Sequence, residues 1–373
     1  MTAIIQKRTL RDFDWLLALL ALAIVGFGAY QIRNAQPTET YWVKQLIGLG
    51  VAVVAMLFVA LTDYRKVISI APTFYAIGLV LLFLVLIPGI GVKVNGQRCW
   101  IKVPLFGHFQ PSEFVKVTTA MMLAWYFGKH RTTTLTVKEI AMGGLILGFP
   151  IALILAEPDL GSVITYFPIL IVVFFLSAIR MRIVVAAVVL SVILIPVSYV
   201  LAVKMHLVKN YQQERINVIL DPENADKRGF GYNTWQSILT VGEGGLFGAA
   251  ASSEHSQSSL KYLPEPHTDF IFAVTAENAG FTGCILLLLG YAILLSRLIT
   301  GARRAPDRPG MLVIMAVVGG MSFQIFINVG MALGLLPVIG VPLPLMSAGL
   351  ASLIATFIAI GFAISVQLRR FVN

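Results

Sequence analysis

The strongest constraint on this chain is a succession of ten apolar segments separated by polar connections. A helix needs about 20 mostly apolar residues to cross the roughly 30 Å hydrocarbon core of a bilayer. The pattern predicts an all-α polytopic membrane protein, a single integral-membrane domain over residues 1–373. We expect ten transmembrane helices, at residues 13–31, 43–62, 69–88, 109–128, 138–156, 160–178, 182–204, 269–296, 311–334 and 346–368.

The composition supports membrane insertion and excludes other classes of protein. The chain is 58% hydrophobic and 12% charged, whereas soluble domains carry about 25% charged residues. The net charge of +10 does not indicate nucleic-acid binding, because the basic residues fall in short clusters between apolar segments and form no single basic face. Two cysteines make no disulfide framework, and none of the five histidines has metal-ligand spacing, so no structural zinc site is expected.

The distribution of lysine and arginine predicts how the chain is oriented. Basic residues in short loops favour the cytoplasmic side of a membrane. If both chain ends lie on one side, that side receives most of them, including the clusters at 65–66 and 303–308. We therefore expect cytoplasmic termini and one long extracytoplasmic loop, about 205–268, between helices 7 and 8. The opposite short loops hold only Arg33, Lys44, Lys93, Arg98 and Lys102.

The sequence LPEPHTDFIFAV, residues 263–274, places Asp269 at the mouth of the eighth span, beside Glu265 and His267. An Asp at the centre of a membrane helix costs roughly 2.5–3.5 kcal/mol, and less near the interface, so an ionisable residue there indicates a functional site. The alternative is structural, because Thr268 or Asp269 can cap the new helix. Local sequence leaves both interpretations open.

Other ionisable residues also lie in or near predicted spans. Glu113 and Lys116 are three residues apart on the fourth span and close enough to pair. A buried pair is more often a structural clamp than a catalyst. Asp159 lies at the outer junction of spans five and six, and Glu277 lies about two turns beyond Asp269, deeper in the eighth span. Carboxylates gathered near the outer leaflet indicate chemistry or binding at the outer surface.

Two glycine-rich stretches allow two interpretations each. The run GEGGLFG, 242–248, follows a short helical stretch near 235–241 and is either a set of turns or a phosphate cradle. The uncharged, Pro- and Gly-rich stretch 328–349 either lines a lipid-accessible groove or forms a rigid re-entrant connector.

Six stretches of sequence, in order along the chain, resemble one family. They are RDFDW (11–15), QPSEFVK (110–116), EPDLGS (157–162), GYNTWQS (231–237), LPEPHTDFIFAV (263–274) and NVGMALGLLPVIGVPLPLMS (328–347). The chain resembles the SEDS proteins (shape, elongation, division and sporulation), the bacterial cell-wall glycosyltransferases. NVGM, GVPLP and the pair Gln257-Ser258 look more like the elongation branch, RodA, than the division branch.

The resemblance implies a peptidoglycan polymerase of the bacterial cytoplasmic membrane, multi-pass, with its active site facing the extracytoplasmic side. It would join lipid II units during cell elongation, with a class B penicillin-binding protein and other elongation-machinery membrane proteins as partners. In the family the aspartate of the HTDF motif is catalytic, which here is Asp269. Glu113 and Lys116 match the pair of the central cavity, and Asp159 matches another sensitive position.

A physical mechanism follows from that expectation. Asp269 would act as general base on the acceptor hydroxyl, and undecaprenyl pyrophosphate would leave, which requires positive charge nearby. Glu265, His267 and Glu277 would support the site. No cofactor is certain, although a divalent cation, Mg²⁺ or Mn²⁺, could serve. The candidate side chains for binding the pyrophosphate are Arg98, Lys102, Arg215 and Lys261.

The sequence also departs from the family. Cys99 stands where the family usually has Arg before the Trp of the first outer loop. Ala249 to Ala251 replace glycines, Asn278 replaces the second Glu after HTDF, and SAGLAS, 347–352, replaces SYGGSS. Two rival functions remain: a lipid II flippase, although no inverted repeat is evident, and a noncatalytic scaffold of the wall-synthesis complex.

Overall fold

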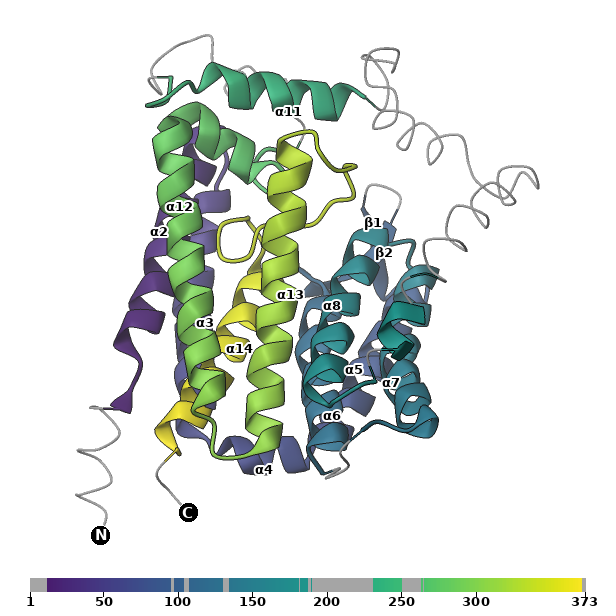
Figure 1. Ribbon diagram of the computed structural model, residues 1–373. Coiled ribbons are helices and arrows are strands. Elements are labelled where there is room, and N and C mark those ends of the chain that lie inside the picture. The colour runs from purple at the N-terminus through teal and green to yellow at the C-terminus, as the bar shows by residue number, and fades with distance from the viewer. Residues whose placement is uncertain are drawn as a thin grey trace.

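The computed structural model describes residues 12–94, 97–103, 107–129, 134–180, 182–186, 189, 231–249, 263 and 265–370. Long helices run side by side through the molecule (Figure 1). The start of α2 and the end of α14 lie at one end of this bundle, whereas α11 and the strands lie at the other. This arrangement agrees with the expectation that both termini share one side.

The helices begin and end close to the residues that the apolar pattern predicts. α2 is capped by Asp14, α8 by Asp159 and α13 by Asp307, each through a carboxylate that accepts a backbone N–H of the first turn. The helices are α2 (Trp15–Ala35), α3 (Tyr41–Leu61), α4 (Tyr64–Ser69), α5 (Ala71–Leu86), α6 (Pro111–Lys129), α7 (Val137–Ala156), α8 (Leu160–Leu176), α11 (Tyr232–Glu243), α12 (Ile271–Arg303), α13 (Arg308–Ala332) and α14 (Leu350–Leu368).

Within the described residues, six helices are long and apolar enough to cross a membrane: α2, α3, α7, α12, α13 and α14. Two shorter apolar helices, α5 and α8, and the helix α6 coincide with three further predicted spans. The seventh predicted span, 182–204, lies mostly outside the described residues, as does the predicted loop up to residue 230. The polytopic helical class therefore holds, while the number of spans remains a prediction.

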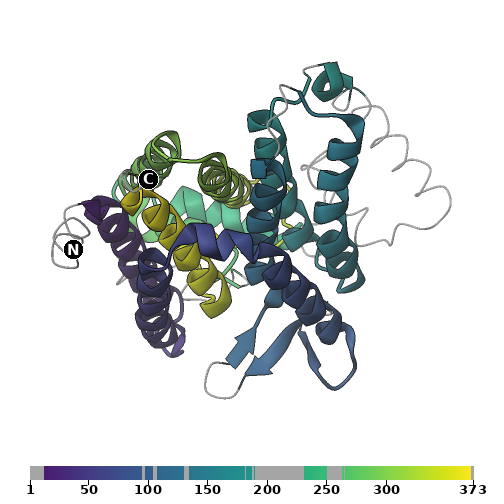
Figure 2. The same ribbon diagram turned by 90° about the horizontal axis from the view of Figure 1, so that it is seen from below.

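The prediction of an all-α fold is wrong between α5 and α6. Three short strands, β1 (Gly91–Val94), β2 (Gln97–Val103) and β3 (Gly107–Phe109), form an antiparallel sheet in the order β1-β2-β3. Figure 2 shows this sheet projecting from the side of the helices. The sequence carries the signal, because Asn95-Gly96 separates two runs of alternating apolar residues, a pattern typical of a β-hairpin.

The eighth predicted span is not one straight helix. Gly280 interrupts α12 with φ 64° and ψ −168°, a conformation essentially restricted to glycine, and Figure 1 shows the α12 ribbon folding over at its upper end. A Cβ at Gly280 would lie 2.3 Å from the Gly248 nitrogen and 2.6 Å from the Phe247 nitrogen. The glycine run 242–248 thus packs against this bend, and Phe281 N–H donates to the Gly245 carbonyl at 2.9 Å.

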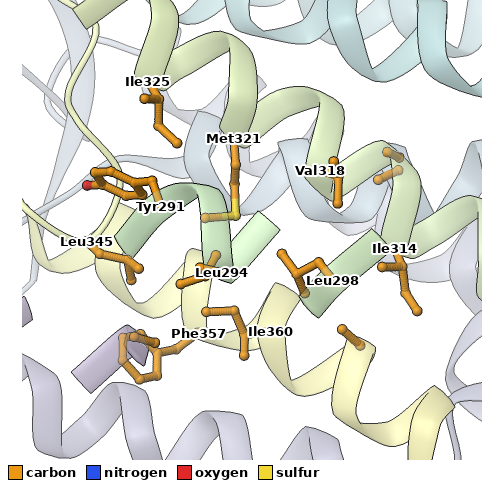
Figure 3. Close-up of a cluster of buried hydrophobic side chains, with 14 of the residues drawn as sticks. Tyr291, Leu294, Leu298, Ile314, Val318, Met321, Ile325, Leu345, Phe357 and Ile360 are labelled. Carbon is orange, nitrogen blue, oxygen red and sulfur yellow. The ribbon is translucent and has the colours of Figure 1, made fainter. Parts of the chain in front are cut away.

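The main apolar core lies between the last three long helices. Figure 3 shows Tyr291, Leu294 and Leu298 of α12 facing Ile314, Val318, Met321 and Ile325 of α13, with Phe357 and Ile360 of α14. Leu345, from the connection between α13 and α14, lies next to Tyr291 at one side of the cluster. α14 also packs along α3, which joins the two ends of the chain into one bundle (Figure 2).

Candidate functional site

Asp269 lies in a turn directly before α12 and does not cap that helix. The cap position is Phe270, which makes no side-chain hydrogen bond to the first turn. The capping interpretation of Thr268 and Asp269 is therefore wrong. The Asp269 carboxylate, which is partly exposed, is left available for other contacts.

The backbone of Asp269 is held by a buried amide from α13. Nδ2 of Asn328 donates to the carbonyl oxygen of Asp269 and to the carbonyl oxygen of Val341, each at 2.8 Å. Asn328 is fully buried, in the last turns of α13. The amide fixes the turn at Asp269 and the segment at Val341 relative to α13. Breaking either bond would leave a buried polar group without a partner, which is costly.

The irregular segment 333–349 returns into the bundle and binds the same turn. Ser347 Oγ donates to the Thr268 carbonyl at 2.6 Å, and Ala348 N–H donates to the His267 carbonyl at 2.8 Å. Ser347 in turn accepts Leu343 N–H, and its own carbonyl accepts Gln45 Nε2 of α3 at 3.1 Å. These bonds favour the interpretation of this segment as a rigid connector.

The surroundings of the Asp269 carboxylate raise its affinity for a proton. Burial, with smaller contributions from the negative charges of Glu265 and Asp159 and against a hydrogen bond from Thr268 that lowers it, raises the pKa of Asp269 to about 7. Oδ2 lies 3.3 Å from the point that a Cβ on Gly340 would occupy, and Gly340 has φ +72°. A glycine here lets the connector approach the carboxylate closely.

His267 lies beside this turn and packs against α3. It is buried, and it stacks on Tyr41 of α3 with ring centroids 4.2 Å apart and planes 22° apart. Burial lowers the pKa of His267, although the negative charges of Glu265 and Glu39 act in the opposite direction. Its Nε2 lies 3.9 Å from Glu265 Oε2, and its buried Nδ1 has no hydrogen-bond partner within the described part of the chain.

The carboxylates of Asp159 and Glu157 differ in their hydrogen-bond partners. Asp159 caps α8 through Ser162 N–H at 3.0 Å and accepts Gln110 Nε2 at 2.9 Å, as well as the Ser162 hydroxyl. Glu157 is fully buried, neither carboxylate oxygen has a hydrogen-bond partner among the described residues, and burial together with Asp159 raises its pKa to about 8. Burial raises the pKa of the Cys99 thiol, and the negative charges of Asp159 and Glu157 raise it further.

Glu113 and Lys116 form the ion pair that their spacing predicts. Lys116 Nζ lies 2.7 Å from Glu113 Oε1, and both side chains are largely buried. They face a cavity of about 60 Å³ between α6, α8, α13 and α14, which Gln324 and Thr356 also line. Gln324 lies one turn before Asn328 on α13, so this helix contacts both the ion pair's cavity and the Asp269 turn.

The remaining predicted residues are dispersed or lie outside the described part. Glu277 is fully buried in the short part of α12 before the bend, so it does not lie deeper along a straight span. Arg98 donates to the Leu86 carbonyl at 3.3 Å, at the end of α5, and Lys102 is exposed on β2. Arg215 and Lys261, with Gln257 and Ser258, lie outside the described residues.

Sequence reasoning missed the residues that hold the site, namely Asn328, Ser347 and Tyr41. The signal for Asn328 was its place in an apolar helix, because a buried amide in a membrane span is costly unless it is hydrogen-bonded. In the part of the chain that the structure describes, no three His, Cys, Asp or Glu side chains are grouped as metal ligands. The turn that carries Asp269 is held by the Asn328 amide and by the Ser347 hydroxyl.

Comparison with known proteins gives consistent matches along the whole chain. The FtsW/RodA/SpoVE family model, described as cell cycle protein, matches residues 12–370. The peptidoglycan glycosyltransferase MrdB of Escherichia coli (strain K12) is 33% identical over 369 residues, which cover 98% of this chain and 97% of that protein. Stage V sporulation protein E of Bacillus subtilis (strain 168) is 33% identical over 364 residues, covering 95% and 96%.

Solved structures show the same architecture. A chain from a peptidoglycan synthase complex, in a study of how polymerization and crosslinking are coordinated, matches with a TM-score of 0.83 at 30% identity, covering 97% of this chain and 99% of that chain. The rod shape determining protein RodA of Thermus thermophilus matches with a TM-score of 0.71 at 28% identity, covering 97% and 98%.

Proposed function

This chain belongs to the FtsW/RodA/SpoVE family of SEDS proteins, and from that premise we propose that it is a peptidoglycan glycosyltransferase. It polymerises lipid II into β-1,4 glycan strands at the outer face of the bacterial cytoplasmic membrane, in cell elongation and shape. The name of its relative MrdB, a peptidoglycan glycosyltransferase, supports the reaction class. The similarity to RodA supports the role in shape.

The observation that carries the proposal is the state of Asp269. Its backbone is fixed by Asn328 and by the Ser347 connector, while its carboxylate caps no helix and keeps partial exposure. A general base works best when its pKa lies near the working pH, and the pKa of Asp269 is about 7. A carboxylate that is held firmly and titrates near neutrality suits proton abstraction.

The proposed reaction needs one base. Asp269 takes the proton from the 4-hydroxyl of N-acetylglucosamine on the acceptor, and that oxygen attacks C1 of N-acetylmuramic acid on the donor. The bond between C1 and the phosphate oxygen breaks, and undecaprenyl pyrophosphate leaves with both electrons. Direct displacement inverts the anomeric carbon from α to β. Hydrolysis of a glycoside, by contrast, also needs an acid to protonate the leaving sugar oxygen.

Base catalysis accounts for only part of the acceleration. It supplies about 10²–10⁴-fold, so positioning and stabilisation of the pyrophosphate supply the rest. The negative charge of the leaving pyrophosphate is stabilised by a positive group, which is either one of the side chains Arg98, Lys102, Arg215 and Lys261 or a divalent cation. Glu113 with Lys116 keeps the central cavity in shape, and Asp159, Glu265, His267 and Glu277 support the carboxylate site.

We further propose the orientation and the partner. The end that carries Asp269, α11 and the strands faces the extracytoplasmic side, and both termini face the cytoplasm. A relative of this chain lies in a peptidoglycan synthase complex in which polymerization and crosslinking are coordinated. That relationship supports a class B penicillin-binding protein as partner, alongside other membrane proteins of the elongation machinery.

Two other functions give different results in one experiment. Purified protein is reconstituted in proteoliposomes with fluorescent lipid II, and both polymer on a gel and exchange between leaflets are measured. Glycan polymer is expected. Exchange without polymer would indicate a lipid II flippase, and neither product, in the presence of the penicillin-binding partner, would indicate a noncatalytic scaffold.

A further inference from the structure

A polar cavity of about 250 Å³ lies at the end of the molecule where α2 begins and where α12 and α14 end, which in Figure 1 is the end opposite α11. The segment before α2 forms one wall, and the ends of α12 and α14 form the others. The cavity is smaller than the roughly 300–1,000 Å³ of typical small-molecule pockets, so it suits a headgroup better than a whole ligand. Its charged and amide lining residues are Asp12, Asp14, Arg297, Arg304, Gln367 and Arg370.

The charges of the cavity do not cancel. Asp14 Oδ2 accepts Nε and Nη2 of Arg297 at 3.2 and 3.0 Å, and Asp12 Oδ1 accepts Nη2 of Arg370 at 3.0 Å. Each acid thereby has its own arginine. Arg304 is exposed at the rim, and no acidic side chain of the described residues pairs with it. One uncompensated positive charge beside hydrogen-bond donors is the complement of a single phosphate anion.

The surroundings of the cavity indicate a lipid as the source of that anion. Trp15 and Leu16 line the cavity and are exposed, and Leu19, one turn further along α2, is exposed as well. Tryptophan is enriched where membrane helices meet the headgroup region. α2 packs against α12, whose Ile293 is also exposed and lies one turn before Arg297, so both helices carry exposed apolar side chains within about one turn of the residues that line the cavity. These side chains offer a path for an acyl chain next to the headgroup.

We propose that this cavity binds the phosphate group of an anionic phospholipid of the cytoplasmic leaflet, with Arg304 as the principal contact and the acyl chain along α2. Basic pockets between membrane helices on the cytoplasmic side are known to take anionic headgroups. The lipid tethers the segment before α2 to the ends of α12 and α14, far from the turn that carries Asp269. The inference does not depend on the proposed reaction, but its assignment to the cytoplasmic leaflet rests on the proposed orientation.

The test uses the full chain in nanodiscs of phosphatidylcholine that contain increasing phosphatidylglycerol. We compare the unchanged protein with Arg304→Gln and with Arg303→Gln, a neighbouring exposed arginine that does not line the cavity. Thermal unfolding and native mass spectrometry report stabilisation and retained lipid. We expect phosphatidylglycerol to raise the unfolding temperature of the unchanged protein and of Arg303→Gln, whereas Arg304→Gln retains about fivefold less lipid.

A second arm separates lipid from free phosphate. Inorganic phosphate is added to the protein in pure phosphatidylcholine discs at constant ionic strength, and no stabilisation is expected. Stabilisation by inorganic phosphate equal to that by phosphatidylglycerol would assign the cavity to free phosphate and overturn the lipid assignment. Equal losses in Arg303→Gln and Arg304→Gln would reduce the effect to general surface charge, and no response to either anion would overturn the site.

Discussion

Asn328 donates hydrogen bonds from one side-chain amide to the carbonyl oxygens of both Asp269 and Val341, each at 2.8 Å. This amide joins the turn before α12 to the connector between α13 and α14. Gln324, four residues earlier and therefore about 6 Å along the helix, lines the cavity of the Glu113–Lys116 pair. α13 thus carries both the amide that holds the turn of the proposed base and a side chain that lines the cavity of the buried ion pair.

Removing the Asn328 amide should therefore loosen the proposed base. Asn328→Leu deletes two hydrogen bonds and leaves two carbonyl oxygens without that donor, a cost of about 1–3 kcal/mol in stability. We expect a lower unfolding temperature and at least about tenfold slower polymerisation per folded molecule, measured after size-exclusion chromatography. Asn278→Leu, which removes an amide that donates to Gln31 at 3.1 Å, is the matched control. A wild-type rate in Asn328→Leu would refute the positioning role.

The Glu113–Lys116 pair should be sensitive to loss of either partner. Glu113→Gln or Lys116→Met leaves one buried charge uncompensated, which typically costs about 3–5 kcal/mol. The double variant with the two charges exchanged keeps the pair, so it should be milder than either single variant. Thermal unfolding and polymerisation rates of the three proteins test this order, and equal damage in all three would argue against a simple ion pair.

The rate should depend on pH through the proposed base. The pKa of Asp269 is about 7, and a base acts only when deprotonated, so kcat/KM should rise through pH 7 and fall below it. The negative charge of Glu265 contributes to that high pKa, so Glu265→Gln should move the midpoint to lower pH. Glu39→Gln, which removes a carboxylate that acts on His267, is the control. A midpoint unchanged by Glu265→Gln would contradict this electrostatic origin.

The bend in α12 should require glycine. At Gly280 a side chain meets both a positive φ and the backbone nitrogens of Phe247 and Gly248, so Gly280→Ala should destabilise the protein by about 1–3 kcal/mol. Gly242→Ala in α11 is the comparison, because its Cβ meets nothing within 4 Å and alanine favours the helix. Chemical denaturation of both variants measures the difference. Equal stability of the two variants would contradict the requirement for glycine at position 280.

The helices were predictable because their signal is local. Apolar length and caps such as Asp14 and Asp159 place most helix ends within a few residues. The bend at Gly280 was not predictable, since it depends on a backbone contact with Gly248, 32 residues earlier in the chain. Asn95-Gly96 is a hairpin signal between β1 and β2. These strands are short and lie between two apolar helices, which made them hard to recognise in the sequence.

The site was predictable in its chemistry and not in its support. An aspartate at the mouth of a membrane helix is conspicuous in sequence, and so is the i, i+3 pair of Glu113 and Lys116. The bonds from Asn328 and Ser347 to the Asp269 turn join residues far apart in the chain, and no local pattern encodes such contacts. The alternative of a helix cap could be decided only by geometry, which places Phe270 at the cap.

The most direct test of the central claim is polymerisation of lipid II by purified Asp269→Asn. Asparagine keeps the size of the side chain and cannot accept the proton, so the protein should fold and enter the membrane as the unchanged protein does. We predict that glycan polymer falls by at least about 10²-fold, the lower end of what a general base supplies. Polymerisation at a rate near that of the unchanged protein would contradict the assignment of Asp269 as the base.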